Sequence, residues 1–235
     1  MKQRHAGMYA VFFVAGSLAV IALVANATRL IFAPRRERRS ERARSGADAT
    51  EAPGDAGLDH QDEQSGVGEL THRCYEVEVP RATFTRQTLI QAIELRMCEL
   101  PPAGLADFEK SSGSAARMTV GDEYDITMLG PWNGRVRVAE VTDASFTLVT
   151  LDGHPEAGHI TFSVEDVPTQ SSVLKVRIES WARARDEAAQ AAYDTLNVGR
   201  RVQTEVWVTF LQRVAEFTGS TAMPEVDIRS EALTS

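Results

Sequence analysis

The residue types that could carry out chemistry gather in the segment 152–159. His154 and Glu156 lie two positions apart, and His159 follows shortly after them. An imidazole beside a carboxylate can perform acid–base chemistry or bind a polar head group. In the alternative interpretation, which we favour, Gly153-His154-Pro155 forms a tight turn in which His154 caps backbone groups.

Metal and cofactor sites have little support in the sequence. His154 and His159 supply two possible metal ligands, but the spacing places no third ligand, so we expect no metal. The chain has no Gly-rich phosphate loop, no nucleophile elbow and no Cys-x-x-Cys motif. These absences argue against nucleotide use, serine hydrolysis and thiol redox chemistry. We therefore expect no cofactor, and reduced thiols at Cys74 and Cys98.

Four aromatic residues and one arginine complete the candidate ligand-binding set. Trp132 could guard a cavity mouth or anchor a hairpin. Trp181 and Arg183 could form a cavity wall and an anion contact, or serve as core and as an ion-pair partner. For Trp207 and Phe210 core packing is the default, although a core residue can also line a ligand cavity. The full set is Trp132, His154, Glu156, Trp181, Arg183, Trp207 and Phe210.

The elements that must position these residues follow from hydrophobic periodicity. Alternation predicts strands near 75–79, 124–128, 135–138, 146–150, 160–165 and 174–179. Helical spacing predicts a helix over 83–98 and a long C-terminal helix from Val198 to Phe217. This order is typical of an α+β, START-like helix-grip fold, in which a curved antiparallel sheet of about six strands packs on the long C-terminal helix.

Two segments resemble a known family. The first is Thr150–Gly158 with Phe162, and the second comprises Ser180–Arg183, Tyr193-Asp194, Gln203, Trp207 and Phe210. Together they resemble the family called domain of unknown function 1990, over roughly 70–219. The resemblance implies a START-like fold and offers no activity to carry over, so it assigns no catalytic residue.

An N-terminal segment has the length and composition of a membrane anchor. Met8–Thr28 carries no charged side chain, and a helix of this length spans ~31 Å. We expect a short flank at 1–7 and a transmembrane signal anchor at 8–33. Seven arginines follow the apolar run, against Lys2 and Arg4 before it, which favours a cytoplasmic C-terminal domain. The alternative is a secretory signal cleaved near Ala27, followed by export.

Charge divides the rest of the chain. Residues 1–45 carry a balance of +7 and the remainder −15, so the acidic folded part argues against nucleic-acid binding. Residues 34–69 read as a basic juxtamembrane segment and a disordered acidic linker. The START-like domain then spans 70–219 and a flexible tail 220–235. Arg35–Arg44 are expected to set topology and to contact anionic lipids.

Three functional hypotheses follow. The first is a membrane-anchored START-like domain that binds a hydrophobic or amphipathic small molecule or a lipid. The second is a small enzyme of cyclase or hydrolase type that uses the loop around His154 and Glu156. The third is a non-enzymatic protein-interaction module at the membrane. The absence of a catalytic constellation favours a non-catalytic role.

Overall fold

The computed structural model describes residues 34–43, 59–129, 133–190 and 198–234. The expected transmembrane segment at 8–33 lies outside these residues, as does Trp132. Among the residues that are described, no helix combines the length and the apolar character needed to cross a bilayer.

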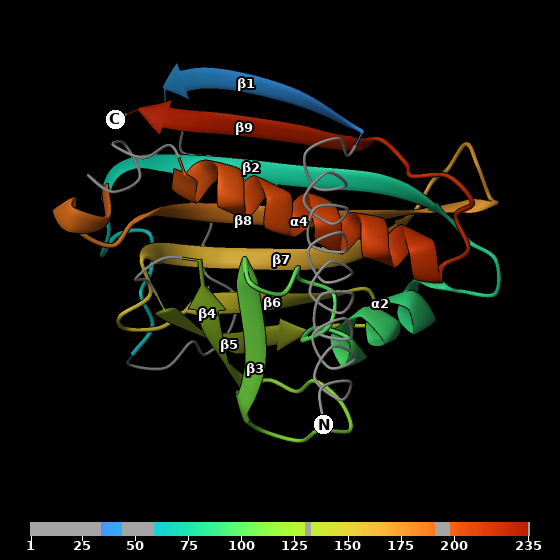
Figure 1. Ribbon diagram of the computed structural model, residues 1–235, viewed down its shortest axis with the longest axis horizontal. Coiled ribbons are helices and arrows are strands. Elements are labelled where there is room, and N and C mark those ends of the chain that lie inside the picture. Colours follow the sequence, from blue (N-terminus) through green and yellow to red (C-terminus); the bar gives the residue numbers. More distant parts are fainter. Residues whose placement is uncertain (1–33, 44–58, 130–132, 191–197, 235) are drawn as a thin grey trace, which may run out of the picture. The chain divides into compact units, whose positions relative to one another are not determined.

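The described part of the chain forms a nine-stranded mixed sheet (Figure 1). Its strands are β1 (Arg35–Ala43), β2 (Val67–Pro80), β3 (Ala106–Ser112), β4 (Glu123–Met128), β5 (Asn133–Val141), β6 (Ser145–Thr150), β7 (Glu156–Asp166), β8 (Val173–Ala184) and β9 (Val226–Thr234). Their order is β1-β9-β2-β8-β7-β6-β5-β4-β3. β1 runs parallel to β9, and the remaining pairs are antiparallel. The expected all-antiparallel sheet of about six strands is therefore wrong in both strand number and orientation.

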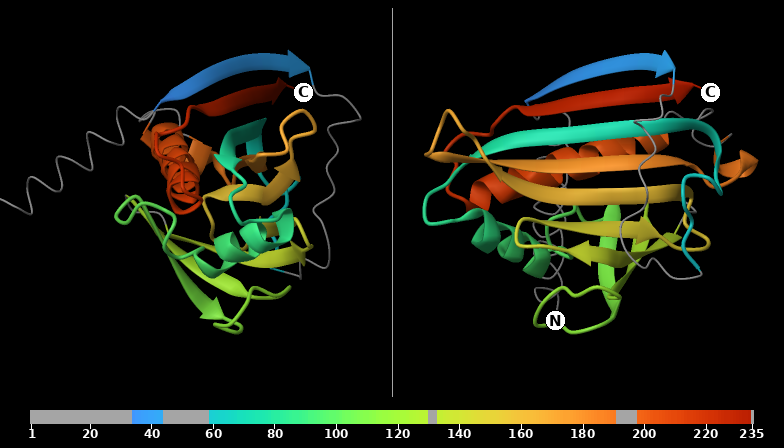
Figure 2. Two further views of the ribbon diagram at one scale, coloured as in Figure 1. Left: turned by 90° about the vertical axis from the view of Figure 1, so that its right-hand side faces the viewer. Right: turned by 180° about the vertical axis from the view of Figure 1, so that it is seen from behind.

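Two helices, α2 (Arg86–Leu95) and α4 (Val198–Phe217), lie on the inner face of this sheet, which curves around α4 (Figures 1 and 2). α2 begins at a capping box in which the hydroxyl of Thr85 accepts from the Thr88 amide, and the Thr88 hydroxyl accepts from the Thr85 amide. Leu89, Ile90 and Ile93 form its buried face. Both helices were predicted from their apolar periodicity, and their positions are confirmed.

The core between α4 and the sheet is aromatic. Phe146 and Phe162 stack with their ring centroids 4.7 Å apart. Trp207 and Phe210 of α4 approach Phe162 at 5.5 and 5.4 Å. These aromatic residues are 7% exposed or less, so this part of the interface is filled with side chains.

The C-terminal segment is not a flexible tail, as was expected, because most of it forms β9. Val226, Ile228 and Leu233 are at most 2% exposed, and β9 pairs along β2 from Glu76 to Leu70. The strand covers the backbone edge of β2 and buries three apolar side chains. The alternating pattern of residues 226–234 is short, and this segment becomes a strand because the edge of β2 supplies partners for its backbone.

β1 occupies part of the expected basic juxtamembrane segment. Eight of its nine residues are exposed, so burial of apolar surface does not hold it in place. Ion pairs join it to the acidic residues of its neighbours: Arg36–Glu225 at 2.8 Å, Arg38–Asp227 at 3.1 Å, Arg42–Glu231 at 3.3 Å, and Arg35 with Glu205 of α4. The arginine run is therefore engaged within the domain, through complementary charge and a parallel backbone ladder.

The last part of the expected acidic linker, residues 59–65, is also ordered against the sheet. The Gln61 side-chain amide donates to the carbonyl oxygens of His154 and Glu156, each at 3.0 Å. Glu63 and His159 are each 7% exposed, and Glu63 Oε1 lies 2.5 Å from His159 Nδ1. Burial of these polar groups is tolerated because they satisfy one another.

Candidate functional site

One of two neighbouring cavities on the inner face is lined by Thr204 of α4, and the two cavities share three lining residues of β2. These are Glu69, Thr71 and Arg73. The first cavity is completed chiefly by Glu156, Arg183 and Gln190. The second, of about 90 Å³, is completed chiefly by Glu37, Arg39, Ser40, Thr204, Ser230 and Glu231.

Small side chains around β2 explain why this region is hollow. Thr71 is flanked in register by Ala182 of β8 and Ala232 of β9. In the next row Arg73 is flanked by two serines, Ser180 and Ser230. Neither row can fill the space between the sheet and α4 in the way that large apolar side chains do.

The next row of side chains along these strands is bulky, and the cavities end at this row. Tyr75 is flanked by Ile178 and Ile228, and all three side chains are at most 1% exposed. Burial raises the pKa of the Tyr75 hydroxyl, so it stays neutral. The aromatic core therefore begins directly beside the polar cavities.

Arg73 is the central charge of the site. Its side chain is 12% exposed and that of Glu156 is 16% exposed, yet the closest approach of their charged atoms is 3.7 Å. Among the described residues this is the one ion pair that Arg73 makes. A guanidinium has five N–H donors, so most of its hydrogen-bonding capacity is unused by protein side chains.

Glu156 is held by the helix. The side-chain amide of Gln203 in α4 donates to Glu156 Oε2 at 3.0 Å. In the same stretch of α4, Gln203 Oε1, Glu205 Oε2 and Trp207 Nε1 are buried polar atoms without a hydrogen-bond partner among the described residues. Unsatisfied buried polar atoms are rare in native proteins, so this half of α4 is unusually poor in hydrogen-bond partners.

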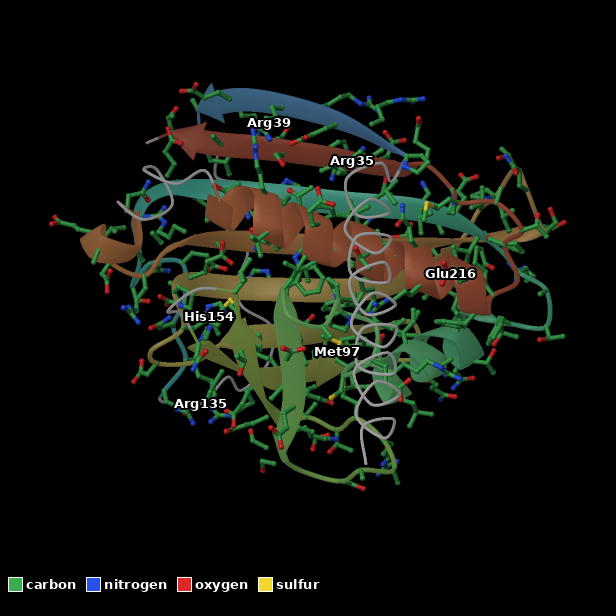
Figure 3. All side chains as sticks on the ribbon, in the orientation of Figure 1. Arg35, Arg39, Met97, Arg135, His154 and Glu216 are labelled. Atoms are coloured by element: carbon green, nitrogen blue, oxygen red, sulfur yellow. The ribbon has the colours of Figure 1, made fainter. Side chains whose placement is uncertain are left out.

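β1 contributes to the same site across β9. In register, Arg39 lies beside Ser230, and Ser230 lies beside Arg73. Figure 3 shows Arg39 extending from β1 toward β2. Its guanidinium pairs with Glu37 of the same strand at 2.6 Å.

The structure separates the residues that the sequence singled out. Glu156 and Arg183 both line the first cavity. Trp207 and Phe210 lie in the aromatic core. Trp181 lies on the opposite face of the sheet, where its ring stacks on His72 with centroids 3.9 Å apart.

His154 has the structural role that the turn interpretation predicted. Its imidazole is 7% exposed, and Nδ1 accepts from the Glu156 amide at 3.0 Å. Burial lowers its pKa, so the ring is neutral at neutral pH. It also packs against Gly134, where an added Cβ would lie 2.2 Å from His154 Cδ2. His154 thus stabilises the turn before β7, and its imidazole makes no hydrogen bond to the carboxylate of Glu156.

The sequence missed Glu69, Arg73 and Arg39 as site residues. Alternation identified β2 only from Tyr75 onward, so Arg73 was not placed on a buried face. An arginine two residues before a buried Tyr-x-Val-x-Val pattern is the signal that could have found it. Metal binding has no support either, since no group of three or more His, Cys, Asp or Glu in the described ranges could hold an ion.

Comparison with solved structures finds several proteins of low identity. Truncated norcoclaurine synthase from Thalictrum flavum is 14% identical with a TM-score of 0.47, covering 66% of this chain and 98% of that one. A hypothetical protein from Helicobacter pylori is 11% identical with a TM-score of 0.45, covering 75% and 99%. A conserved protein from Geobacillus kaustophilus is 11% identical with a TM-score of 0.41, covering 66% and 98%. No curated protein matches the chain.

A family model also matches the chain. The model of the domain of unknown function DUF1990 matches residues 45–216. The match contains β2 to β8 and most of α4, whereas β1 and β9 lie outside it. It confirms the family that the sequence motifs suggested. The chain therefore belongs to the DUF1990 family.

Proposed function

We propose that this domain binds a small amphipathic molecule in the two cavities beside α4, with an anionic group of that molecule against Arg73. The observation that carries the proposal is the state of Arg73. Its side chain is only 12% exposed, yet among the described residues its one ion pair has a separation of 3.7 Å. Burying a charge is costly unless hydrogen bonds compensate, and an anionic ligand supplies that compensation.

The surroundings support this assignment. Thr71, Ser230 and Thr204 offer hydroxyl groups at the cavity walls. Ala182 and Ala232 offer apolar surface on either side of Thr71. A ligand with a charged end and a short apolar part matches this mixture better than a wholly apolar one.

The catalytic alternative is not favoured. An enzyme built on the loop around His154 and Glu156 requires His154 to exchange a proton at the site. The imidazole is buried in the turn, with Nδ1 engaged by a backbone amide. Glu156 lines the cavity, and its carboxylate pairs with the side chains of Gln203 and Arg73 and not with His154.

Calorimetric titration of the full chain with three probes of equal chain length tests the proposal. The probes are hexanoate, hexylammonium and hexanol, and hexanoate is expected to bind most tightly. Arg73→Gln removes charge-assisted hydrogen bonds, so it should weaken hexanoate binding at least about tenfold. Arg73→Lys keeps the charge and should retain part of the affinity.

Arg135→Gln is the matched control. Arg135 of β5 also has a long ion pair, at 3.8 Å to Glu123, but its side chain is 47% exposed (Figure 3). Three strands separate β5 from β2 in the sheet. The proposal fails if hexanoate shows no preference over hexanol, or if Arg73→Gln and Arg135→Gln bind it equally well while both retain the circular dichroism of the parent chain.

A further inference from the structure

We infer that the ligand of these cavities is zwitterionic, with a cationic group recognised by Glu69 in addition to the anionic group at Arg73. The inference rests on the proposed function, since it assigns the second charge of the same ligand. It identifies a recognition residue and a chemical class beyond an amphipathic anion.

The charge of the lining is the first observation. The first cavity presents two carboxylates, Glu69 and Glu156, and two guanidinium groups, Arg73 and Arg183. The second presents both signs as well, through acidic residues of β1, β2 and β9 and through Arg39 and Arg73. A lone ion of either sign would face like charges there, whereas a molecule that carries both signs can place each charge favourably.

The carboxylates that line the cavities differ in whether they already pair with another side chain. Glu37 pairs with Arg39, and Glu231 pairs with Arg42 at 3.3 Å. Glu156 accepts from Gln203. Glu69 makes no side-chain ion pair or hydrogen bond with any other described residue, although it lines both cavities.

The separation of Glu69 and Arg73 along β2 sets the distance between the two charges of the ligand. The two residues are four positions apart on β2, and Thr71 lies between them, so their Cα atoms are roughly 13 Å apart along the strand. All three residues line both cavities. Because both side chains are long and line the same cavities, this spacing suits a cation and an anion separated by several bonds.

The strands outside the family match close this site. β1 and β9 supply Arg39, Ser40, Ser230 and Glu231 to the second cavity, and neither strand falls within residues 45–216. Without them β2 would be a sheet edge open to solvent. The second cavity is therefore built partly by strands that lie outside the matched family domain.

The test compares hexanoate with 6-aminohexanoate, which adds an ammonium group at the far end of the same chain. Titration of the full chain should show 6-aminohexanoate binding up to about fivefold more tightly, the upper end of the gain from one solvent-accessible ion pair. Glu69→Gln should abolish that gain, and because it removes a negative charge from the lining, it should not weaken the binding of hexanoate. Because Glu69 is exposed, this substitution should not disturb folding.

Glu78→Gln is the matched control, since Glu78 lies on the same strand with an exposed side chain on the opposite face. It should preserve the preference for 6-aminohexanoate. Equal affinity for both probes in the parent chain would overturn the inference, as would a preference that survives in Glu69→Gln. Failure of the proposed function is separate, because then hexanoate itself would not depend on Arg73.

Discussion

Replacement of Phe162 by alanine should remove the centre of the contact between α4 and the sheet. The side chain is 1% exposed and touches three aromatic rings, at 4.7 Å to Phe146, 5.5 Å to Trp207 and 5.4 Å to Phe210. Truncation of a buried phenylalanine typically costs about 3–5 kcal/mol through lost transfer free energy and the cavity left behind. Three aromatic contacts place this site at the upper end, near 5 kcal/mol.

Such a loss is a large part of the 5–15 kcal/mol by which domains are usually stable. For a domain of this size it corresponds to a fall in Tm of about 10–20 °C. Phe162→Leu retains most of the volume and should cost roughly 1–2 kcal/mol. The difference between the two variants therefore isolates cavity formation from the loss of aromatic geometry.

Urea unfolding followed by tryptophan fluorescence and by circular dichroism measures both effects. The midpoint should shift while the slope m stays constant, because the same surface is exposed on unfolding. Val120→Ala is the control, since Val120 is 56% exposed and its truncation should change stability by less than about 0.5 kcal/mol. A loss below about 1.5 kcal/mol for Phe162→Ala would refute the packing described for this interface.

Three further predictions address charge and close packing. Arg38 pairs with Asp227 at 3.1 Å, so Arg38→Glu places two negative charges next to each other, and amide hydrogen exchange in β1 should become faster. Unchanged exchange would contradict the role of these ion pairs in holding β1. Burial raises the pKa of Glu94 to about 7, so the folded protein retains a proton that the unfolded chain releases near the ordinary glutamate pKa of 4.5. The free energy of unfolding should therefore fall as pH rises from about 4.5 to 7, and Glu94→Gln should stabilise the protein at pH 8 but not at pH 4. Equal effects of the substitution at both pH values would exclude a raised pKa of Glu94. Gly134→Ala would place a methyl group 2.2 Å from His154 Cδ2, so Tm should drop by several degrees. A Tm within about one degree of the parent would show that the buried imidazole ring can move to make room.

The sequence determined the elements whose signal is local. Alternation located six of the nine strands, because a half-buried strand must change face at every residue. Spacings of three and four residues located α4, since a helix with one broad apolar face buries it against the largest partner. Gly153-His154-Pro155 was identified as a turn, because its chemistry depends on residues within two positions.

Tertiary structure decided whatever depends on residues that are distant in the chain. β9 becomes a strand because it pairs with the edge of β2, and β1 because its basic residues pair with β9, nearly two hundred residues away in the chain. β3 was missed because only two of its side chains are buried, which leaves a weak alternating pattern.

The candidate site depends on the same long-range contacts. Arg73 looks like an ordinary surface arginine in the sequence, whereas in the folded chain its side chain is 12% exposed and lies beside Glu156. Its neighbours Ser180 and Ser230 come from β8 and β9, and only register brings them together. Local pattern fixes which face a side chain takes, whereas the pairing of distant strands fixes which side chains share a cavity.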